Sequence, residues 1–211
     1  TIELFDNHPD IDGVVVVCLE SCIPFLQKML KKFEINRVVR VIPDGVSGQD
    51  AIFKGLCAAE EYAKEQNDDS TIVLIHDGVR PLITEDTITD NIAKVNECGS
   101  CITIVPATET FVVKRNDGSL ELPKRSECCL ARAPQSFYLK DIISAHRKSQ
   151  EEGKTDFIDS CSLMSHYGIK LGLVEGPMEN IKITTPTDYF VLRAMVEVHE
   201  NQQIFGIYCN E

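Results

Sequence analysis

The stretch Thr71-Ile72-Val73-Leu74-Ile75-His76-Asp77-Gly78-Val79-Arg80-Pro81 decides the fold, because an apolar run ends there abruptly in charge. Residues 71–75 are β-branched or leucine without alternation, which is typical of a parallel strand covered on both faces. Ligands of open α/β sheets bind just beyond the carboxyl ends of strands. A carboxylate such as Asp77 can hold Mg²⁺, and a guanidinium such as Arg80 can grip phosphate. The stretch therefore predicts a phosphate-handling site, with a turn closed by a surface ion pair as the alternative.

The composition limits the classes of partner. The 211 residues are enough for one α/β domain with a complete core. Their 21 Lys and Arg against 33 Asp and Glu give a net charge of −12, which argues against nucleic acid and anionic membranes as partners. A phosphorylated small molecule stays possible in a locally basic pocket. No apolar run approaches the roughly 18 residues of a membrane span.

Nine cysteines lie scattered through the chain, several of them in apolar runs. An odd count in a chain with a large core is typical of reduced thiols, so we expect a cytoplasmic protein. Cys98-Gly-Ser-Cys101 has the C-x-x-C spacing, but no second pair or histidine cluster follows it at zinc spacing. We therefore expect these cysteines to serve packing rather than metal binding or redox chemistry.

Strands and helices alternate along the first half of the chain, which is the order of a parallel sheet with right-handed crossovers. Strands are predicted at 12–19, 37–42, 71–75 and 101–105, with helices at 20–33, 50–64 and 84–95. Two helices at 139–150 and 157–166, a short strand at 170–174 and a last helix from 186 to about 200 complete the chain. We expect a single α/β domain with a doubly wound, mostly parallel, Rossmann-like sheet.

A segment at about 107–132 breaks this rhythm. Extended patterns at 110–115 and 125–132, with the turn Asn116-Asp117-Gly118 after the first, predict a β-hairpin. Such a hairpin would project from the sheet as an arm. Projecting arms often exchange contacts in symmetric dimers, so we expect a homodimer formed through the arm, with a solvent-exposed flap as the alternative.

Three motifs carry a resemblance to a known family. They are His76-Asp77-Gly78-Val79-Arg80-Pro81, Ala133-Pro134-Gln135-Ser136-Phe137, and Val174-Glu175-Gly176 continuing to Asn180-Ile181-Lys182-Ile183-Thr184-Thr185-Pro186-Thr187-Asp188. In this order they resemble the cytidylyltransferases that join CTP to polyol phosphates and make CDP-methylerythritol or CDP-ribitol. The resemblance covers residues 1 to about 196. It implies that a substrate phosphate attacks the α-phosphorus of CTP and releases pyrophosphate, which needs positioning and charge neutralisation rather than a covalent nucleophile.

The resemblance also implies roles for three charged residues. Asp77 resembles the acid that binds Mg²⁺ on the triphosphate, and Lys182 resembles the lysine that holds the attacking phosphate. Arg80 resembles the motif arginine, for which we expect a structural ion pair beside the site. Because Lys182 lies between two isoleucines on a predicted strand, its ammonium should point away from both, toward water, a ligand or an acid.

Further candidates are expected around the polyol phosphate. Arg125 and Thr110, on the arm, resemble residues that grip this substrate, in this family across the dimer. Asp159 resembles an acid near the substrate, and a helix N-cap is its alternative role. Glu179 is a candidate second metal ligand, although a solvated loop carboxylate is the stronger expectation.

Residues 44–51 align with the loop that reads cytosine in the family. Gly48 stands where many members have arginine, and Ala51 where they have serine or threonine. Gly45 keeps close approach of the backbone to the base, and Gln49 can supply amide contacts. The choice of base therefore stays open. The nucleotide-binding candidates are Asp44, Gly45, Ser47, Gln49, Ala51 and Gly78.

One family feature has no counterpart in this sequence. The family opens with a strand and a glycine-rich loop bearing an arginine, followed by Pro-Lys-Gln, and that strand would lie in mid-sheet beside residues 14–17. Without it, buried backbone groups on two strand edges would lack partners, at roughly 1–3 kcal/mol each. We therefore expect these 211 residues to be inactive by themselves.

The sequence as a whole predicts a nucleotidyltransferase that transfers CMP from CTP to a polyol phosphate with Mg²⁺. The acceptor 2-C-methyl-D-erythritol 4-phosphate is slightly preferred, because that activity is the most widespread in the family. The alternative acceptor is D-ribitol 5-phosphate. A transferase for another sugar phosphate and base, and an inactive nucleotide-binding or scaffolding relative, are the other hypotheses.

Overall fold

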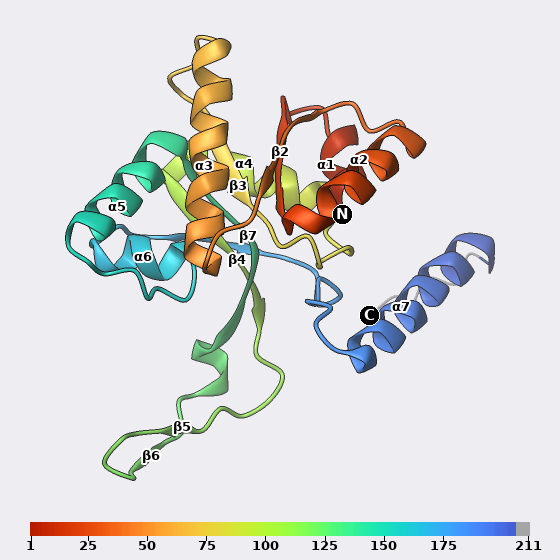
Figure 1. Cartoon of the computed structure of the whole chain (residues 1–211). Helices are drawn as coiled ribbons and strands as arrows, with labels where there is room; N and C mark the ends of the chain where they lie inside the picture. Colours follow the sequence, from red (N-terminus) through yellow and green to blue (C-terminus); the bar gives the residue numbers. More distant parts are fainter. Residues whose placement is uncertain (206–211) are drawn as a thin grey trace.

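The computed structural model describes residues 1–205 and contains eight strands in that range (Figure 1). They are β1 (Val14–Cys18), β2 (Val38–Pro43), β3 (Ile72–Ile75), β4 (Ser100–Pro106), β5 (Val113–Lys114), β6 (Leu120–Glu121), β7 (Cys129–Tyr138) and β8 (Gly172–Glu175). The main sheet has the order β3-β7-β4-β8, while β1 and β2 form a separate parallel pair and β5 and β6 a small hairpin. The α/β class predicted from the sequence is confirmed.

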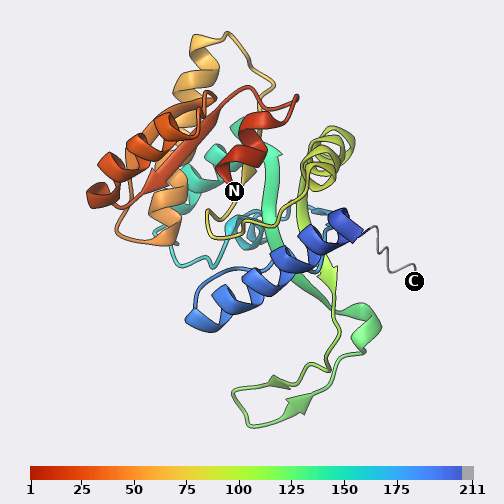
Figure 2. The ribbon, with the colours of Figure 1, turned by 90° about the vertical axis from the view of Figure 1, so that its right-hand side faces the viewer.

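Helices cover both faces of the main sheet (Figures 1 and 2). They are α1 (Ile2–Asn7), α2 (Ile23–Lys32), α3 (Gly48–Glu65), α4 (Glu85–Cys98), α5 (Leu139–Glu151), α6 (Ser160–His166) and α7 (Pro186–Phe205), with short 3₁₀ helices at Glu20–Cys22 and Arg125–Glu127. Adjacent side chains of β7 show the two faces. Ser136 donates to Asn91 on α4, whereas Gln135 contacts Asp159 and the backbone of Cys161 at the start of α6. No helix within 1–205 is both long and apolar enough to cross a bilayer.

Local signals place the helix ends. The hydroxyl of Ser47 accepts from the N–H of Asp50 and caps α3, and Thr84 caps α4 in the same way. Gly99 ends α4 with φ +89°, the left-handed conformation that glycine adopts without strain. Asp159 and Ser162 form a capping box at the start of α6.

Strand β7 differs from the predicted topology. It pairs antiparallel with β3, where Gln135 lies opposite Ile75, and antiparallel with β4, where Ser136 lies opposite Cys101. The expectation that residues 125–132 form one leg of the arm hairpin is wrong, since β5 pairs with β6 and the strand that starts at Cys129 runs on through the core. Because β3, β4 and β8 share one direction, the main sheet is still mostly parallel.

An arm leaves the sheet where β4 and β7 separate. Its base is closed by the pairing of Pro106 with Cys129 and by a hydrogen bond from the N–H of Ala107 to the carbonyl of Cys128. Beyond that point the chain projects as a long loop that ends in the β5–β6 hairpin (Figures 1 and 2). A protruding arm was expected from the sequence, and the structure contains one.

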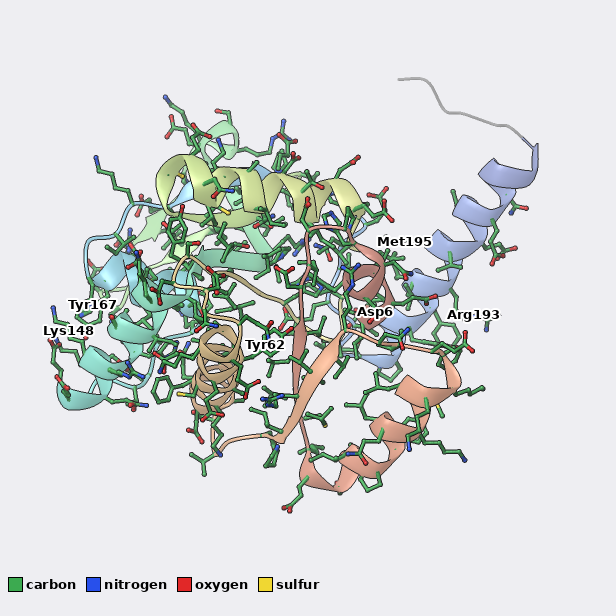
Figure 3. All side chains as sticks on the ribbon, turned by 90° about the horizontal axis from the view of Figure 1, so that it is seen from above. Asp6, Tyr62, Lys148, Tyr167, Arg193 and Met195 are labelled. Carbon is green, nitrogen blue, oxygen red and sulfur yellow. The ribbon has the colours of Figure 1, made fainter. Side chains whose placement is uncertain are left out.

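Side-chain contacts at the periphery tie helices to their neighbours, as the view in Figure 3 shows. The carboxylate of Asp6 on α1 accepts from the N–H groups of Asn36 and Arg37 and so holds the loop that leads into β2. On the opposite side, the ammonium of Lys148 on α5 lies 4.4 Å from the ring centre of Tyr167, which follows α6. These contacts fix the helices around the sheet.

The β1–β2 pair and the main sheet face each other across a cavity of about 970 Å³. Its walls include residues 14–17 of β1 and 72–75 of β3, and the two strands do not pair with each other. Tyr62 of α3 also lines the cavity, and Figure 3 shows it between α3 and the β1–β2 pair. The mouth of the cavity includes Asp77 and Gly78, directly after β3.

Candidate active site

The turn that follows β3 holds an acid and an arginine in one tight arrangement. The N–H of Arg80 donates to the carbonyl of Asp77 at 3.0 Å, and the Nε of Arg80 donates to Oδ2 of Asp77 at 2.8 Å. His76 closes the same turn, because its Nε2 donates to the carbonyl of Arg80 at 3.1 Å. Arg80 is buried, so its ion pair with Asp77 is shielded from water on one side.

Lys182 reaches this turn from 105 residues further along the chain. Its Nζ donates to Oδ1 of Asp77 at 2.8 Å, so the two oxygens of one carboxylate accept from two different cations. The N–H of Ile183 donates to the carbonyl of Val79 at 2.9 Å and anchors the lysine segment beside the turn. The structure thus brings Asp77, Arg80 and Lys182 together.

The lysine does not lie on a strand. Residues 181–184 have no regular secondary structure, so the strand predicted from the alternation of Ile181, Lys182 and Ile183 is wrong. The side-chain direction inferred from it is nevertheless right, because the ammonium points to an acid. The anchor is the single backbone bond to Val79 together with the contacts of Asn180, rather than a sheet ladder.

Asn180 joins all three sequence motifs, and the sequence analysis gave it no role. Its carbonyl accepts from Nη1 of Arg80 at 2.8 Å, and its Nδ2 donates to the carbonyl of Ala133 at 2.7 Å. The residue is fully buried and stands two positions before Lys182. The only signal for it in the sequence is an asparagine directly before the alternating Ile181-Lys182-Ile183.

The cations decide the charge state of the acid. Burial alone would raise the pKa of Asp77, but the hydrogen bonds from Lys182 and Arg80 outweigh burial and hold the pKa below its ordinary value. Burial lowers the pKa of His76 to about 4, against the opposing effect of its hydrogen bond to the carbonyl of Arg80. At neutral pH the site therefore combines an ionised carboxylate, two cations and a neutral imidazole.

The donor set fits a magnesium ion that is completed by substrate. Mg²⁺ is usually held by one or two carboxylates, water and substrate phosphates rather than by an all-protein cage. Asp77 offers one partly exposed carboxylate at the mouth of the cavity. Within residues 1–205 no group of three or more His, Cys, Asp or Glu side chains is arranged to hold a metal without substrate.

The arm candidates lie apart from this group in a single chain. Nη1 of Arg125 makes a 3.5 Å contact with the carbonyl of Thr108, on the arm itself. Thr110 is exposed on the arm. Neither residue makes a hydrogen bond or ion pair with Asp77 or Lys182 within the described chain.

Asp159 has a structural task in this chain. Its Oδ1 accepts from the N–H of Ser162 at 2.7 Å, and its Oδ2 accepts from Nε2 of Gln135 at 3.0 Å. The cap anticipated as the alternative role is therefore present. Gln135, which the sequence analysis quoted only as part of a motif, links this cap to the centre of β7 by also accepting from the N–H of Cys161.

The candidate nucleotide loop is held mainly by its own contacts. A Cβ at Gly45 would overlap the side chain of Asp50, so any other residue there would displace that side chain. The backbone N–H of Asp44 donates to the carbonyl of Cys18, and Ser47 caps α3. The Nε2 of Gln49 is buried without an acceptor among the described residues.

Only two of the nucleotide candidates reach the cavity beside Asp77. Ala51 and Gly78 both line it, and a Cβ at Gly78 would meet no atom within 4 Å. The space beside Gly78 is therefore open. These two residues therefore line the same cavity as Asp77, while Asp44, Gly45 and Ser47 lie on the loop between β2 and α3 and Gln49 lies in the first turn of α3.

An α/β sheet whose strand-end carboxylate lies between an arginine and a lysine defines a site for phosphate-group chemistry. The family of 2-C-methyl-D-erythritol 4-phosphate cytidylyltransferases (IspD) matches residues 1–198 of this chain. The chain belongs to this family, which confirms the resemblance carried by the three motifs and makes it a nucleotidyltransferase by descent.

Relatives that carry one of two protein names match nearly the whole chain. Ribitol-5-phosphate cytidylyltransferase of Vibrio parahaemolyticus is 49% identical over 207 residues, covering 98% of this chain and 85% of that protein. The protein of the same name from Streptococcus agalactiae serotype III is 46% identical, with the same coverage. 2-C-methyl-D-erythritol 4-phosphate cytidylyltransferase of Clostridium botulinum is 32% identical over 198 residues, covering 93% of this chain and 83% of that protein.

A solved structure shares the fold. The crystal structure of 4-diphosphocytidyl-2C-methyl-D-erythritol synthase from Anaerococcus prevotii superposes with a TM-score of 0.82 at 23% identity, covering 93% of this chain and 84% of that one. At this identity the likeness supports the fold alone. It agrees with the α/β architecture described above.

Proposed function

We propose that this protein is a CTP-dependent cytidylyltransferase that transfers CMP to D-ribitol 5-phosphate and releases pyrophosphate. The observation that carries the proposal is the meeting of Asp77, Arg80 and Lys182, from two distant motifs, beside a cavity that Asp77 lines. Two cations against one carboxylate leave one net positive charge, which suits the phosphates of two anionic substrates.

The balance of relatives supports this acceptor over methylerythritol phosphate. The relatives from Vibrio parahaemolyticus and Streptococcus agalactiae, named for ribitol 5-phosphate, are 49% and 46% identical to this chain, whereas the one from Clostridium botulinum named for methylerythritol phosphate is 32% identical. The preferred acceptor therefore changes from the order expected from the sequence, and methylerythritol phosphate becomes the second candidate.

The proposed reaction is one direct displacement. A phosphate oxygen of the acceptor forms a bond to the α-phosphorus of CTP while the bond from that phosphorus to the oxygen leading to the β-phosphorus breaks, and pyrophosphate leaves with the electron pair. Lys182 holds the attacking phosphate and neutralises charge as it develops. Arg80, buried and tied to Asn180, keeps the Asp77 carboxylate in place and ionised.

We propose Asp77 as the protein ligand of Mg²⁺. When bound, the metal ion would neutralise phosphate charge. In the structure Lys182 occupies Oδ1 of Asp77, so the lysine would have to exchange that oxygen for a substrate phosphate when the site fills. Because the side chain of Lys182 is about half exposed, such an exchange needs no unfolding of the core.

We also propose that a further strand with a glycine-rich loop belongs between β1 and β3, and that residues 1–211 are inactive without it. The support is the cavity of about 970 Å³ that separates these two strands and is lined by residues of both. A strand there would pair with β1 on one side and β3 on the other. Its loop would then emerge beside Asp77 and Gly78.

A homodimer through the arm remains our proposal for the assembly. Its support is the exposure of three large apolar side chains on the arm, Val112, Leu120 and Leu122, which a partner would cover. Cytoplasmic location likewise remains a proposal, supported by the free cysteines, two of which, Cys101 and Cys161, are buried in the core.

The test of the function measures pyrophosphate release. A family strand and glycine-rich loop would be joined ahead of Thr1, and the product assayed with CTP, Mg²⁺ and a panel of ribitol 5-phosphate, methylerythritol 4-phosphate and other polyol phosphates. We expect turnover with ribitol 5-phosphate to exceed that with every other acceptor, and residues 1–211 alone to be inactive. The same assay with ATP, GTP and UTP tests the base.

Three outcomes would contradict the proposal in different parts. Preference for methylerythritol phosphate would reject the acceptor, and preference for another nucleotide would reject the base. An absence of turnover across the panel, by a chain that folds and binds CTP, would favour the inactive nucleotide-binding relative.

A further inference from the structure

Arg132 is an arginine without a partner close to the candidate active site. It lies on β7 next to Ala133, whose carbonyl accepts from Asn180. Its Nε is buried, and no described residue accepts a hydrogen bond from it. No carboxylate of the described chain lies within ion-pair distance of Arg132 either, in contrast to Arg80 and Lys182.

The chain locally offers Arg132 more positive charge and no free acid. Burial lowers the pKa of Arg132, and so does repulsion between its guanidinium and the nearby positive charge of Arg80. Both oxygens of Asp77 already accept from Arg80 and Lys182. The carboxylate of Asp77 thus serves two cations and not Arg132, and a partly buried cation without an acid partner is stabilised by an anion from outside the chain.

The backbone around Arg132 places it between the two groups of proposed substrate residues. The pairing of β7 with β4 is irregular here, since Gln135 lies opposite Ile102 but Ala131 lies opposite Ile104. Toward the sheet, Arg132 is one residue from the Asn180 contact that leads to Arg80. Toward the arm, the strand leads back to the turn that holds Arg125.

We propose that Arg132 binds the phosphate group of the acceptor substrate and so contributes to acceptor specificity. The inference rests on the proposed function and deepens it. A guanidinium suits this task because its planar fork donates to two oxygens of one phosphate. An acceptor that approaches between the Asp77 turn and the arm brings its phosphate to a guanidinium that has no carboxylate partner among the described residues.

The test compares three variants in the chain that carries the added strand and loop. Arg132→Gln removes the charge, Arg132→Lys keeps the charge but removes the fork, and Arg147→Gln makes the same change in an arginine on α5 whose partner is Glu60. We expect Arg132→Gln to raise KM for ribitol 5-phosphate about ten- to a hundredfold, the loss typical of one charge-assisted hydrogen bond. KM for CTP should stay within about twofold, and Arg147→Gln should behave as the parent.

A second measurement separates this inference from the proposed function. Inorganic phosphate should raise the thermal unfolding temperature of the parent and of Arg147→Gln, and raise it less in both Arg132 variants. Phosphate protection that depends on Arg132 would support the anion site even if no polyol phosphate were turned over. Because Arg132→Lys retains the charge, it keeps the test open if Arg132→Gln fails to fold.

Three results would overturn the inference. The first is an unchanged KM for the acceptor in Arg132→Gln. The second is an equal rise of KM for CTP and acceptor, which would show a general loss of site geometry. The third is dissociation of a dimer by Arg132→Gln with normal phosphate protection, which would assign Arg132 to a carboxylate of a second copy.

Discussion

Asp77 is the central residue of the site, because it pairs with both cations. One of its oxygens accepts from an arginine three positions away and the other from a lysine 105 positions away. Each hydrogen bond favours the ionised carboxylate and holds its pKa below the ordinary value, although burial opposes them. Arg80 is buried and paired, as expected for a structural ion pair, whereas Lys182 is the more exposed of the two cations and so the freer to change partner.

Replacing Lys182 with alanine should lower kcat by about 10²–10³-fold, because one preorganised positive group is lost from the transition state. The fold should survive, since the exposed lysine contributes little to stability. The measurements are steady-state kinetics and thermal unfolding. Lys64→Ala, which removes an exposed lysine paired with Glu60 on α3, is the matched control. A change in kcat of less than about tenfold would show that the lysine has another role.

Among the elements, the arm continues directly into the central strand β7. The chain leaves the sheet after β4, makes the β5–β6 hairpin, and returns through Arg125 into a strand that runs between β3 and β4. A movement of the arm base would therefore be transmitted to Ala133 and, through Asn180, to Arg80. This linkage gives a physical route by which an arm held by a partner could order the site.

Replacing Arg125 with alanine should weaken use of the acceptor more than binding of CTP, because the arm is proposed to hold the polyol phosphate. We expect KM for ribitol 5-phosphate to rise about tenfold or more with KM for CTP nearly unchanged. Arg115→Ala is the control on the same arm, since Arg115 pairs with Glu121 in the hairpin. Equal losses for both substrates in Arg125→Ala would count against the arm as the acceptor-binding element.

On the scale of the whole molecule, buried histidines make stability depend on pH. Burial lowers the pKa of His146, which stacks on Phe53 in the α3–α5 interface, to about 4, as it does for His76. In the unfolded chain both should titrate near 6.5. Between about pH 4 and 6.5 the unfolded state therefore binds more protons than the folded state. The contribution of the two histidines to the free energy of unfolding is fully present above about pH 6.5 and is lost as the pH falls toward about 4.

The His146→Phe variant tests this dependence, because phenylalanine fills similar space without titrating. Denaturant unfolding at several values between pH 7 and pH 4.5 should show a shallower loss of stability in the variant than in the parent. Near pH 5 the slope of the free energy of unfolding against pH should correspond to the uptake of almost one proton fewer on unfolding in the variant than in the parent. Identical slopes would show that His146 is protonated in the folded protein at the same pH as in the unfolded one.

Much of the local structure could be predicted because its causes are local. The apolar run at 71–75 acts on its immediate neighbours, so the strand that precedes Asp77 was expected where it occurs, and the helix expected at 84–95 occurs at Glu85–Cys98. The segment 107–132 could likewise be recognised, because extended patterns and a turn replace the alternation of strands and helices there. The three motifs were enough to indicate the family.

The tertiary structure alone decided how these pieces meet. The interior course of β7 could not be inferred, because Pro134 argues against a central strand and nothing local shows that residues 133–138 have a partner on each side. The contacts of Asn180 join the turn after β3, strand β7 and the segment before Lys182, which are far apart in the chain. Sequence thus determined the elements through short-range propensity and pattern, whereas the site arose only when long-range packing brought Lys182 and Asn180 within hydrogen-bond distance of Asp77 and Arg80.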